Sequence, residues 1–278
     1  MALGATSSCA AHRSGAVTCR GADRPVTLLD ADHGAVEVAV GDLRSCARTS
    51  AGEVWCWHWY DQLQDLPVRL DDRTDAMQLA GNFPDGDPFT RGEDLFVLRH
   101  DGSVTVHPYE GPASTLTGVK GVVAIASSDR LLCFTHAGGE VSCVNLLRDK
   151  PALERFPSAE RFTQVAVGHR EICGVTRAGA VQCWQWEIYS AQFVAWEAPV
   201  QPPPVRLVVG DGFACGLASD GLVTCWGKTP WPKLGSQGVV GLPAVTDLFA
   251  GADQMCARSL EGSTWCLGKD AHGQIGDG

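Results

Sequence analysis

"EICGVTRAGAVQCWQW", residues 171–186, places Cys173 and Cys183 ten positions apart with Gly179 between them. The same arrangement returns as "FACGLASDGLVTCWGK" at residues 213–228. All twelve cysteines of the 278-residue chain fall into six such pairs, which are Cys9 with Cys19, Cys46 with Cys56, Cys133 with Cys143, Cys173 with Cys183, Cys215 with Cys225, and Cys256 with Cys266. Each pair has a glycine six residues after its first cysteine. The chain is therefore built from repeats.

The spacing of each pair fits a β-hairpin. A three-residue loop that ends on Gly15 with positive φ puts Cys9 opposite Cys19. Directly opposed residues have Cβ atoms about 4.5–5.5 Å apart, which is near what a disulfide requires. Zinc ligands usually lie two to four residues apart, a spacing that no pair shows here, and buried free thiols are the simpler alternative. We predict six cross-strand disulfides.

A seventh copy of the repeat contains no cysteine. In "LFVLRHDGSVTVHPY", residues 95–109, the turn glycine is Gly102. The same offsets place Phe96 and Val106 where the other copies have their cysteines. An apolar pair replaces the disulfide, so we expect these two side chains to face each other inside a core.

A short apolar strand that ends in a small residue precedes most hairpins, as in "VAVG" at 38–41 and again at 165–168. With Phe96 included, the first residues of the pairs advance by 37 to 50 positions. A period of about 40 residues with four short strands is typical of a propeller blade. We predict an all-β, seven-bladed β-propeller that forms a single domain over residues 1–278. A β-solenoid or two stacked sandwiches are the alternatives.

The runs "QVAVGHREICGVTRAGAVQCWQW" at 164–186 and "DLFAGADQMCARSLEGSTWCLGKDAHGQIGDG" at 247–278 resemble repeats of the regulator of chromosome condensation family. The resemblance covers essentially the whole chain and implies a seven-bladed propeller, in particular one of the secreted bacterial type. It does not transmit a function, because this scaffold serves unrelated binding tasks.

Composition excludes several classes of partner. The formal net charge is −10 and the pI about 5.2, and no run of lysine or arginine is present, so we expect no nucleic-acid partner. No stretch approaches the roughly 20 apolar residues of a membrane span. Twelve paired cysteines indicate an oxidising compartment, so we predict a secreted, periplasmic or cell-surface protein.

Loops carry function on rigid scaffolds, and one irregular segment that stands out is a loop insertion at 82–95, where the usual step of five residues to the Phe96 position has grown to fifteen. We predict that its aromatic and charged residues contact a partner, and these are Phe83, Asp85, Asp87, Phe89 and Arg91. A calcium site is an alternative because carboxylates alternate here, although the spacing does not match an EF-hand loop. A merely solvated insertion is the plainer interpretation.

A second set of candidates is aromatic. An aromatic-rich loop at 184–204 and the neighbouring runs lead us to add five residues to the partner-binding set, namely Trp59, Trp186, Tyr189, Trp196 and Trp231. Tryptophan and tyrosine are frequent anchors of interfaces, but they also serve as wedges between propeller blades. For Trp57, Trp184 and Trp226, which directly follow a second cysteine, the core interpretation is favoured.

These patterns favour a non-catalytic extracytoplasmic propeller that recognises a protein or peptide through loops on one face. We expect a monomer with no metal and no cofactor. No catalytic motif such as G-x-S-x-G or H-E-x-x-H occurs. An extracytoplasmic enzyme with a site in the central channel is the alternative. A guanine-nucleotide exchange factor for a small GTPase is a third hypothesis, which the acidic charge and the paired cysteines disfavour.

Overall fold

A computed structural model describes residues 1–4, 7–20, 26–41, 44–60, 63–64, 66–82, 94–146, 153–156, 158–187, 192–198, 202–229 and 242–269. These residues form 27 strands and one short 3-10 helix, η1 (Ala31–His33). Among them, no helix has the length and apolar character needed to cross a membrane. The protein is an all-β, seven-bladed β-propeller, as the repeats predict.

The chain divides into two compact units, one built on Met1–Asp129 and the other on Arg130–Lys269. Seven antiparallel sheets follow one another along the sequence, and the division falls within the fourth of them. Whether residues 1–278 behave as a single domain stays a prediction. The two units are described separately below.

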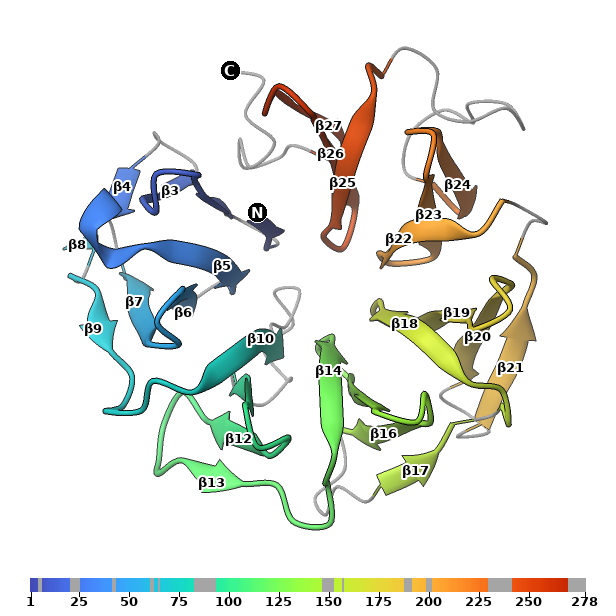
Figure 1. Ribbon diagram of the computed structural model, residues 1–278, viewed down its shortest axis with the longest axis horizontal. Helices are drawn as coiled ribbons and strands as arrows, with labels where there is room; N and C mark the ends of the chain where they lie inside the picture. The colour runs from blue at the N-terminus through green and yellow to red at the C-terminus, as the bar shows by residue number, and fades with distance from the viewer. Residues whose placement is uncertain are drawn as a thin grey trace. The chain divides into compact units, whose positions relative to one another are not determined.

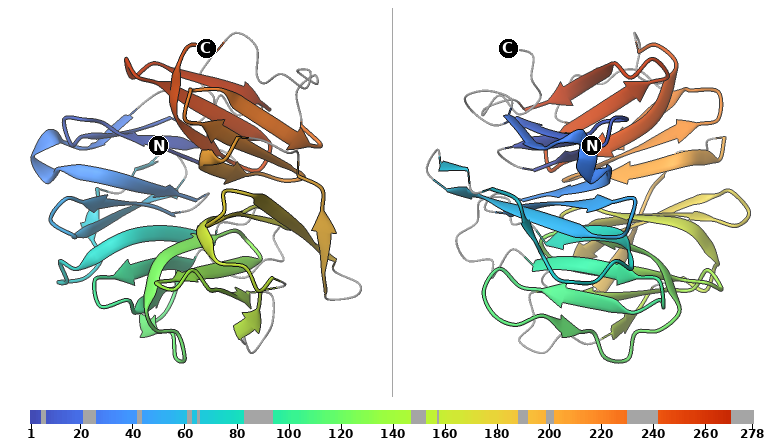
Figure 2. Two further views of the ribbon diagram at one scale, coloured as in Figure 1. Left: turned by 45° about the vertical axis from the view of Figure 1, so that its right-hand side comes forward. Right: turned by 60° about the vertical axis from the view of Figure 1, so that its left-hand side comes forward.

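The first unit holds three complete sheets and the first strand of the fourth. The first sheet consists of β1 (Ala2–Leu3), β2 (Ser8–Ala11), β3 (Val17–Arg20) and β4 (Val26–Leu29). The second consists of β5 (Ala35–Val40), β6 (Arg44–Thr49), β7 (Val54–Tyr60), β8 (Leu63–Gln64) and β9 (Val68–Arg69). The third consists of β10 (Ala76–Asn82), β11 (Asp94–Arg99), β12 (Val104–His107) and β13 (Ser114–Thr115), and β14 (Val122–Ser127) follows. The first strands β5, β10 and β14 lie in succession (Figure 1, Figure 2).

The second unit holds the rest of the fourth sheet and three more. The fourth sheet continues with β15 (Leu131–His136), β16 (Val141–Asn145) and β17 (Leu153–Arg155). The fifth consists of β18 (Phe162–Val167), β19 (Glu171–Thr176), β20 (Val181–Glu187) and β21 (Gln192–Trp196). The sixth contains β22 (Pro204–Val209), β23 (Phe213–Ala218) and β24 (Val223–Gly227), and the seventh β25 (Val245–Ala250), β26 (Gln254–Ser259) and β27 (Thr264–Gly268).

The predicted hairpin register is confirmed in every copy. In six hairpins the two cysteines are directly opposed and joined by a disulfide, with Cα atoms 4.0–4.1 Å apart. The confirmed pairs are Cys9 with Cys19, Cys46 with Cys56, Cys133 with Cys143, Cys173 with Cys183, Cys215 with Cys225, and Cys256 with Cys266. In the third sheet Phe96 pairs with Val106, and the Phe96 side chain is buried. An apolar cross-strand pair therefore takes the place of a disulfide there.

The turn glycines have a second role that local sequence patterns do not indicate. Gly52 has a φ of +79°, as the predicted turn requires, but a Cβ at this position would also lie 2.3 Å from the Thr74 carbonyl oxygen. Its own carbonyl accepts a hydrogen bond from the Ala76 N–H at 3.1 Å. Because Ala76 begins the next sheet, the glycine permits this turn to pack against the following sheet, and the carbonyls of Gly15, Gly102 and Gly139 accept the equivalent bond.

Glutamine side chains join neighbouring first strands. The Gln78 amide donates to the Ile125 carbonyl at 2.8 Å and accepts from the Ile125 N–H at 2.9 Å. Gln164 makes the same pair of bonds to Leu207 in the second unit, at 3.1 and 3.2 Å. Each glutamine side chain thus makes with the neighbouring first strand the pair of hydrogen bonds that a backbone residue makes with its partner in a β-ladder.

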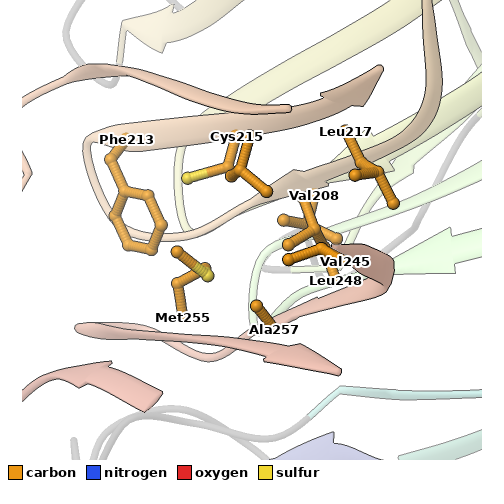
Figure 3. Packing of buried hydrophobic residues seen from close by; sticks show 9 residues of the cluster. Val208, Phe213, Cys215, Leu217, Val245, Leu248, Met255 and Ala257 are labelled. Atoms are coloured by element: carbon orange, nitrogen blue, oxygen red, sulfur yellow. The ribbon is translucent and has the colours of Figure 1, made fainter. Parts of the chain in front are cut away.

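Apolar side chains from adjacent sheets interlock to form the core. Figure 3 shows one such layer, in which Phe213, Cys215 and Leu217 of the sixth sheet face Leu248 and Met255 of the seventh. All five are at most 2% exposed. The sheets are thus buried face to face, and their ends and connecting loops remain to contact other molecules.

Candidate interaction site at one end of the first unit

In the first unit, each sheet has two ends. We call the end at which a first strand stops and the second strand starts the loop end, and the opposite end, which carries the turns at Gly15, Gly52 and Gly102, the hairpin end. The predicted insertion leaves the third sheet at its loop end. There Asn82, the last residue of β10, still pairs with Asp94, the first residue of β11. The insertion therefore extends from a paired stem.

The predicted contact residues of the insertion are Phe83, Asp85, Asp87, Phe89 and Arg91, and they lie outside the described residues. Their assignment to partner binding stays a prediction. The structure describes the paired stem, Asn82 and Asp94, from which the insertion extends.

Arg44 joins the second and third sheets at this end. Its side chain is buried, and its two terminal nitrogens donate to the His107 carbonyl at 2.6 Å and the Pro108 carbonyl at 3.3 Å. Since Arg44 begins β6 and His107 ends β12, the guanidinium joins the second and third sheets. Burial raises the pKa of the Asp94 carboxyl, and the nearby positive charge of Arg44 partly offsets that rise. Charge-assisted hydrogen bonds from Arg44 thus fix the end of β12, the strand that pairs with β11 beside the stem.

Two half-buried rings lie at the same end of the sheets. His58, which pairs with Arg44 across β6 and β7, contacts Tyr109 with ring centroids 5.4 Å apart and planes at 90°. An imidazole, a phenol and the Asp94 carboxyl therefore lie at the loop end of the second and third sheets. Such groups can donate to or accept from the backbone of a bound chain, and the rings add apolar contact area.

A buried charge network supports the third sheet from its hairpin end. The Arg99 guanidinium is fully buried and lies 2.6 Å from Asp71 and 3.0 Å from Asp75. It also donates to the Thr105 hydroxyl at 3.2 Å. The imidazole of His107 lies 3.3 Å from Arg99, and burial, assisted by this positive charge, lowers the pKa of His107 to about 4. The network is internally satisfied, so we assign it to stability.

Sequence reasoning missed this network. Its one signal is that Arg99 stands where the other hairpins have shorter side chains such as Thr49 and Thr176. Those hydroxyls accept only a local hydrogen bond, from the N–H of Glu53 and Ala180.

The predicted aromatic candidates do not form one surface in the described residues. Trp186 is 7% exposed and packs edge-on against Phe193 with centroids 4.8 Å apart. Trp196 is half-buried against the core between the fifth and sixth sheets. Tyr189, Trp231 and the side chain of Trp59 lie outside the described residues. Partner binding by these five residues stays a prediction.

The three tryptophans that directly follow a second cysteine lie in the core or against it. Trp57 and Trp184 are buried, and Trp226 is half-buried. Within the described ranges, no three His, Cys, Asp or Glu side chains gather in a way that could hold a metal ion.

Comparison with known proteins supports the fold. No family profile matches the chain. It is 26% identical over 137 residues to the serine/threonine-protein kinase-like protein CCR2 of Arabidopsis thaliana, a match that spans 43% of this chain and only 16% of that relative. The chain therefore corresponds to a small part of the curated relative.

Three solved structures illustrate the likeness. The CRINKLY WD40 ectodomain of the Arabidopsis thaliana receptor kinase ACR4 superposes with a TM-score of 0.69 at 18% identity, covering 99% of this chain and 96% of that one. Human WBSCR16 gives 0.70 at 15% identity, covering 91% and 80%. Prp20p of Saccharomyces cerevisiae, the yeast RCC1, gives 0.62 at 16% identity, covering 82% and 71%. At these identities the likeness establishes a propeller and leaves function open.

Proposed function

We propose that this chain is a non-catalytic extracytoplasmic propeller that recognises a protein or peptide partner through loops at the loop end of its first unit. The observation that carries the proposal is the insertion at 82–95, which extends from a paired stem beside the strand end that Arg44 fixes. A long connection on a rigid, buried base is typical of a binding loop, because the base limits the entropy lost when the loop is ordered by a partner.

Two further observations support this proposal. Six disulfides are typical of an oxidising, extracellular environment, and we place the chain among secreted, periplasmic or cell-surface proteins, in the bacterial secreted class that its repeats resemble. Similar propellers include a receptor-kinase ectodomain and a yeast protein studied for its binding to Gsp1p and histones.

Peptide-display selection on the immobilised, non-reduced chain tests the proposal. We expect selected peptides to bind the wild type and to lose about tenfold in affinity or more, about 1.4 kcal/mol, when residues 83–92 are replaced by a short Gly-Ser linker. A matched control exchanges the exposed turn residues Ser50 and Ala51 in the second sheet for glycine and should leave affinity unchanged.

Two outcomes would contradict the proposal. If no peptide family is enriched and the purified chain instead turns over a hydrolase substrate panel, the enzyme hypothesis replaces it. If peptides are enriched but bind the linker variant as tightly as the wild type, binding does not use the insertion.

A further inference from the structure

Most first strands carry one extra residue at the same place. The register shifts between Ala35 and Glu37, Ala76 and Gln78, Phe162 and Gln164, Pro204 and Arg206, and Val245 and Asp247. The residue skipped at each shift is the bulged one, so the five bulged residues are Val36, Met77, Thr163, Val205 and Thr246. Val123 occupies the equivalent position of β14. All six side chains are exposed. Bulges re-aim side chains, and here they direct one residue per sheet to solvent.

The second unit shows which residue type suits this position. The Thr163 hydroxyl donates to the Val175 carbonyl and the Thr246 hydroxyl to the Arg258 carbonyl, each at 3.1 Å. Val175 and Arg258 are the residues opposite the bulge, where the strand ladder is interrupted. A threonine therefore supplies a hydrogen bond at the site of the interruption.

The first unit has apolar residues at all three of its equivalent positions. Val36 is 53% exposed, Met77 40% and Val123 50%. None of these side chains can donate the bond that threonine makes, and half-exposed apolar groups contribute little to folding. We call this set, Val36, Met77 and Val123, the apolar ridge. The fold does not require it, because the second unit uses threonine at two of its three positions.

The three ridge residues lie on successive sheets at the hairpin end. The residue before each of them donates a hydrogen bond to the previous sheet's turn, since the carbonyls of Gly15, Gly52 and Gly102 accept from Ala35, Ala76 and Val122 at 2.8, 3.1 and 3.4 Å. Bonds from Gln78 to Ile125 hold two of the strands together. The first strands β5, β10 and β14, which carry the ridge, are neighbours in Figure 1. The ridge thus lies on a rigid backbone.

The surroundings of the ridge are acidic. Residues 1–129 contain 18 aspartates and glutamates against 10 lysines and arginines, a net charge of −8, of which the insertion at 82–95 at the opposite end contributes −3, whereas residues 130–269 contain 12 of each. Exposed carboxylates accompany each part of the ridge, with Asp32 close before Val36, Asp72 close before Met77, and Asp101 in the turn that packs against the start of β14. The cations nearby are Arg13 in the turn at Gly15, Arg48, which is paired with Glu37, Arg73, which is paired with Asp75, and Lys120.

We infer that the hairpin end of the first unit is a docking surface for a protein segment that combines apolar side chains with lysine or arginine. The apolar side chains would cover the ridge, and the cations would pair with the surrounding carboxylates. Exposed apolar residues at equivalent positions of three adjacent sheets, with a charged rim, are the composition expected of such a surface. This surface lies at the opposite end of the sheets from the insertion, so it adds a second interface to the proposed function and does not depend on it.

The methionines of the chain provide a direct readout. The chain contains three methionines, of which Met77 is 40% exposed on the ridge and Met255 is 1% exposed in the second unit. The full chain labelled with ¹³C at its methionine methyl groups is titrated with a short synthetic peptide in which lysine and leucine alternate. We expect the Met77 methyl signal to shift with saturation while the Met255 signal stays in place.

Substitution by threonine removes the ridge without removing the fold. The variant V36T/M77T/V123T should keep its thermal midpoint, because threonine is the residue the second unit uses, and should bind the peptide about tenfold more weakly or worse by calorimetry. The matched control is Val205→Thr in the second unit, which should leave peptide affinity unchanged. Replacing lysine by glutamate, or leucine by serine, in the peptide should abolish binding.

Several outcomes would overturn the inference. These are a Met77 signal that does not move in the wild-type protein, a ridge variant with unchanged affinity, and equal binding of the glutamate–leucine peptide, which would show that charge does not select the partner. The Met77 titration uses the unaltered chain, so the inference stays testable even if the triple variant folds poorly. Replacing residues 83–92 by the Gly-Ser linker should have no effect on binding of this peptide, which separates this test from that of the proposed function.

Discussion

The hairpin of the third sheet and the hairpins of the other six sheets are stabilised by different interactions. In six sheets a disulfide joins the second and third strands, as Cys173 joins Cys183. In the third sheet Phe96 and Val106 occupy the same cross-strand position, and a buried network around Arg99 is added. A disulfide acts largely by restricting the unfolded chain, whereas the network acts only once the sheet has formed. The third sheet should therefore respond differently to reduction, mutation and pH.

The comparison also shows what sets the hairpin register. The turn at Gly102 closes with hydrogen bonds between Arg99 and Ser103 at 2.9 Å and from Gly102 to Arg99 at 3.0 Å. The disulfide-bonded turn at Gly179 has the matching bonds at 2.8 and 2.9 Å. Since the turn is the same with and without sulfur, the glycine and the strand pairing fix the register, and the disulfide stabilises a geometry that already exists.

Reduction of the disulfides should have the largest effect. Each bridge closes an eleven-residue loop and contributes about 2–3 kcal/mol, so complete reduction should lower the thermal midpoint by about 20 °C or more. Hydrogen exchange followed by mass spectrometry should show β15, β16, β19 and β20 losing protection first and β11 and β12 last. Earlier loss in β11 and β12 would show that the third sheet depends on its neighbours' disulfides.

Replacement of Arg99 should have the next largest effect. Arg99→Met leaves Asp71 and Asp75 without their buried partner, and we expect a loss of about 3 kcal/mol in the free energy of unfolding, because breaking a buried ion pair is costly. Arg73→Met is the matched control, since Arg73 pairs with the same Asp75 but is exposed, and should cost less than about 1 kcal/mol. Urea unfolding measures both. Equal losses would refute the special role of the buried arginine.

Acidification should weaken the third sheet through His107. Burial lowers the pKa of His107 from its ordinary 6.5 to about 4 in the folded protein. Between these values the unfolded chain binds more protons than the folded one, so stability is lost as the pH falls from about 6.5 toward 4. We expect a loss of about 2 kcal/mol between pH 6.5 and 4.5. His107→Gln should remove this part of the pH dependence, and an unchanged urea-unfolding profile would contradict the assignment.

Installing a seventh disulfide should have the smallest effect. In the variant F96C/V106C the new bridge gains about 2–3 kcal/mol, but loss of the buried Phe96 ring costs a similar amount. We expect a net change within about 1 kcal/mol under oxidising conditions and a clear loss after reduction. Thermal unfolding with and without reductant checks this, with bridge formation confirmed by peptide mapping. A gain well above this value would mean that Phe96 packs poorly.

The sequence predicts the repeat architecture well because the repeat depends on local geometry. Turn chemistry places Gly179 and the cysteine spacing fixes the pairing, so the hairpins follow from residues that are close in the chain. The second role of Gly52 depends on Thr74, which belongs to the connection to the next sheet, and no local pattern shows that contact.

Prediction is less successful at the candidate sites. The Arg99 network joins residues 24 and 28 positions apart, so it is invisible to a search for short motifs. The ridge depends on β-bulges. In the sequence each bulge is only one additional apolar residue within a strand, and nothing marks that residue as exposed. Conversely, the predicted loop residues, such as Phe83 and Asp85, draw on composition alone, and the structure describes only the stem beneath them.

The turn carbonyls of Gly15, Gly52, Gly102 and Gly139 accept a hydrogen bond from the following strand, and these bonds limit how the chain can vary. An additional residue in the turn at Gly52 would push its backbone into Thr74, so turn length is constrained at that end of the sheet. At the other end, the chain between Gly81 and Phe96 takes fifteen steps where five are usual, and the pairing of Asn82 with Asp94 is intact. Selection or engineering can therefore alter loop length at one end, and at the other only the identity of single side chains on an unchanging backbone. Two kinds of recognition, one by shape and one by residue chemistry, could then evolve independently on the same protein.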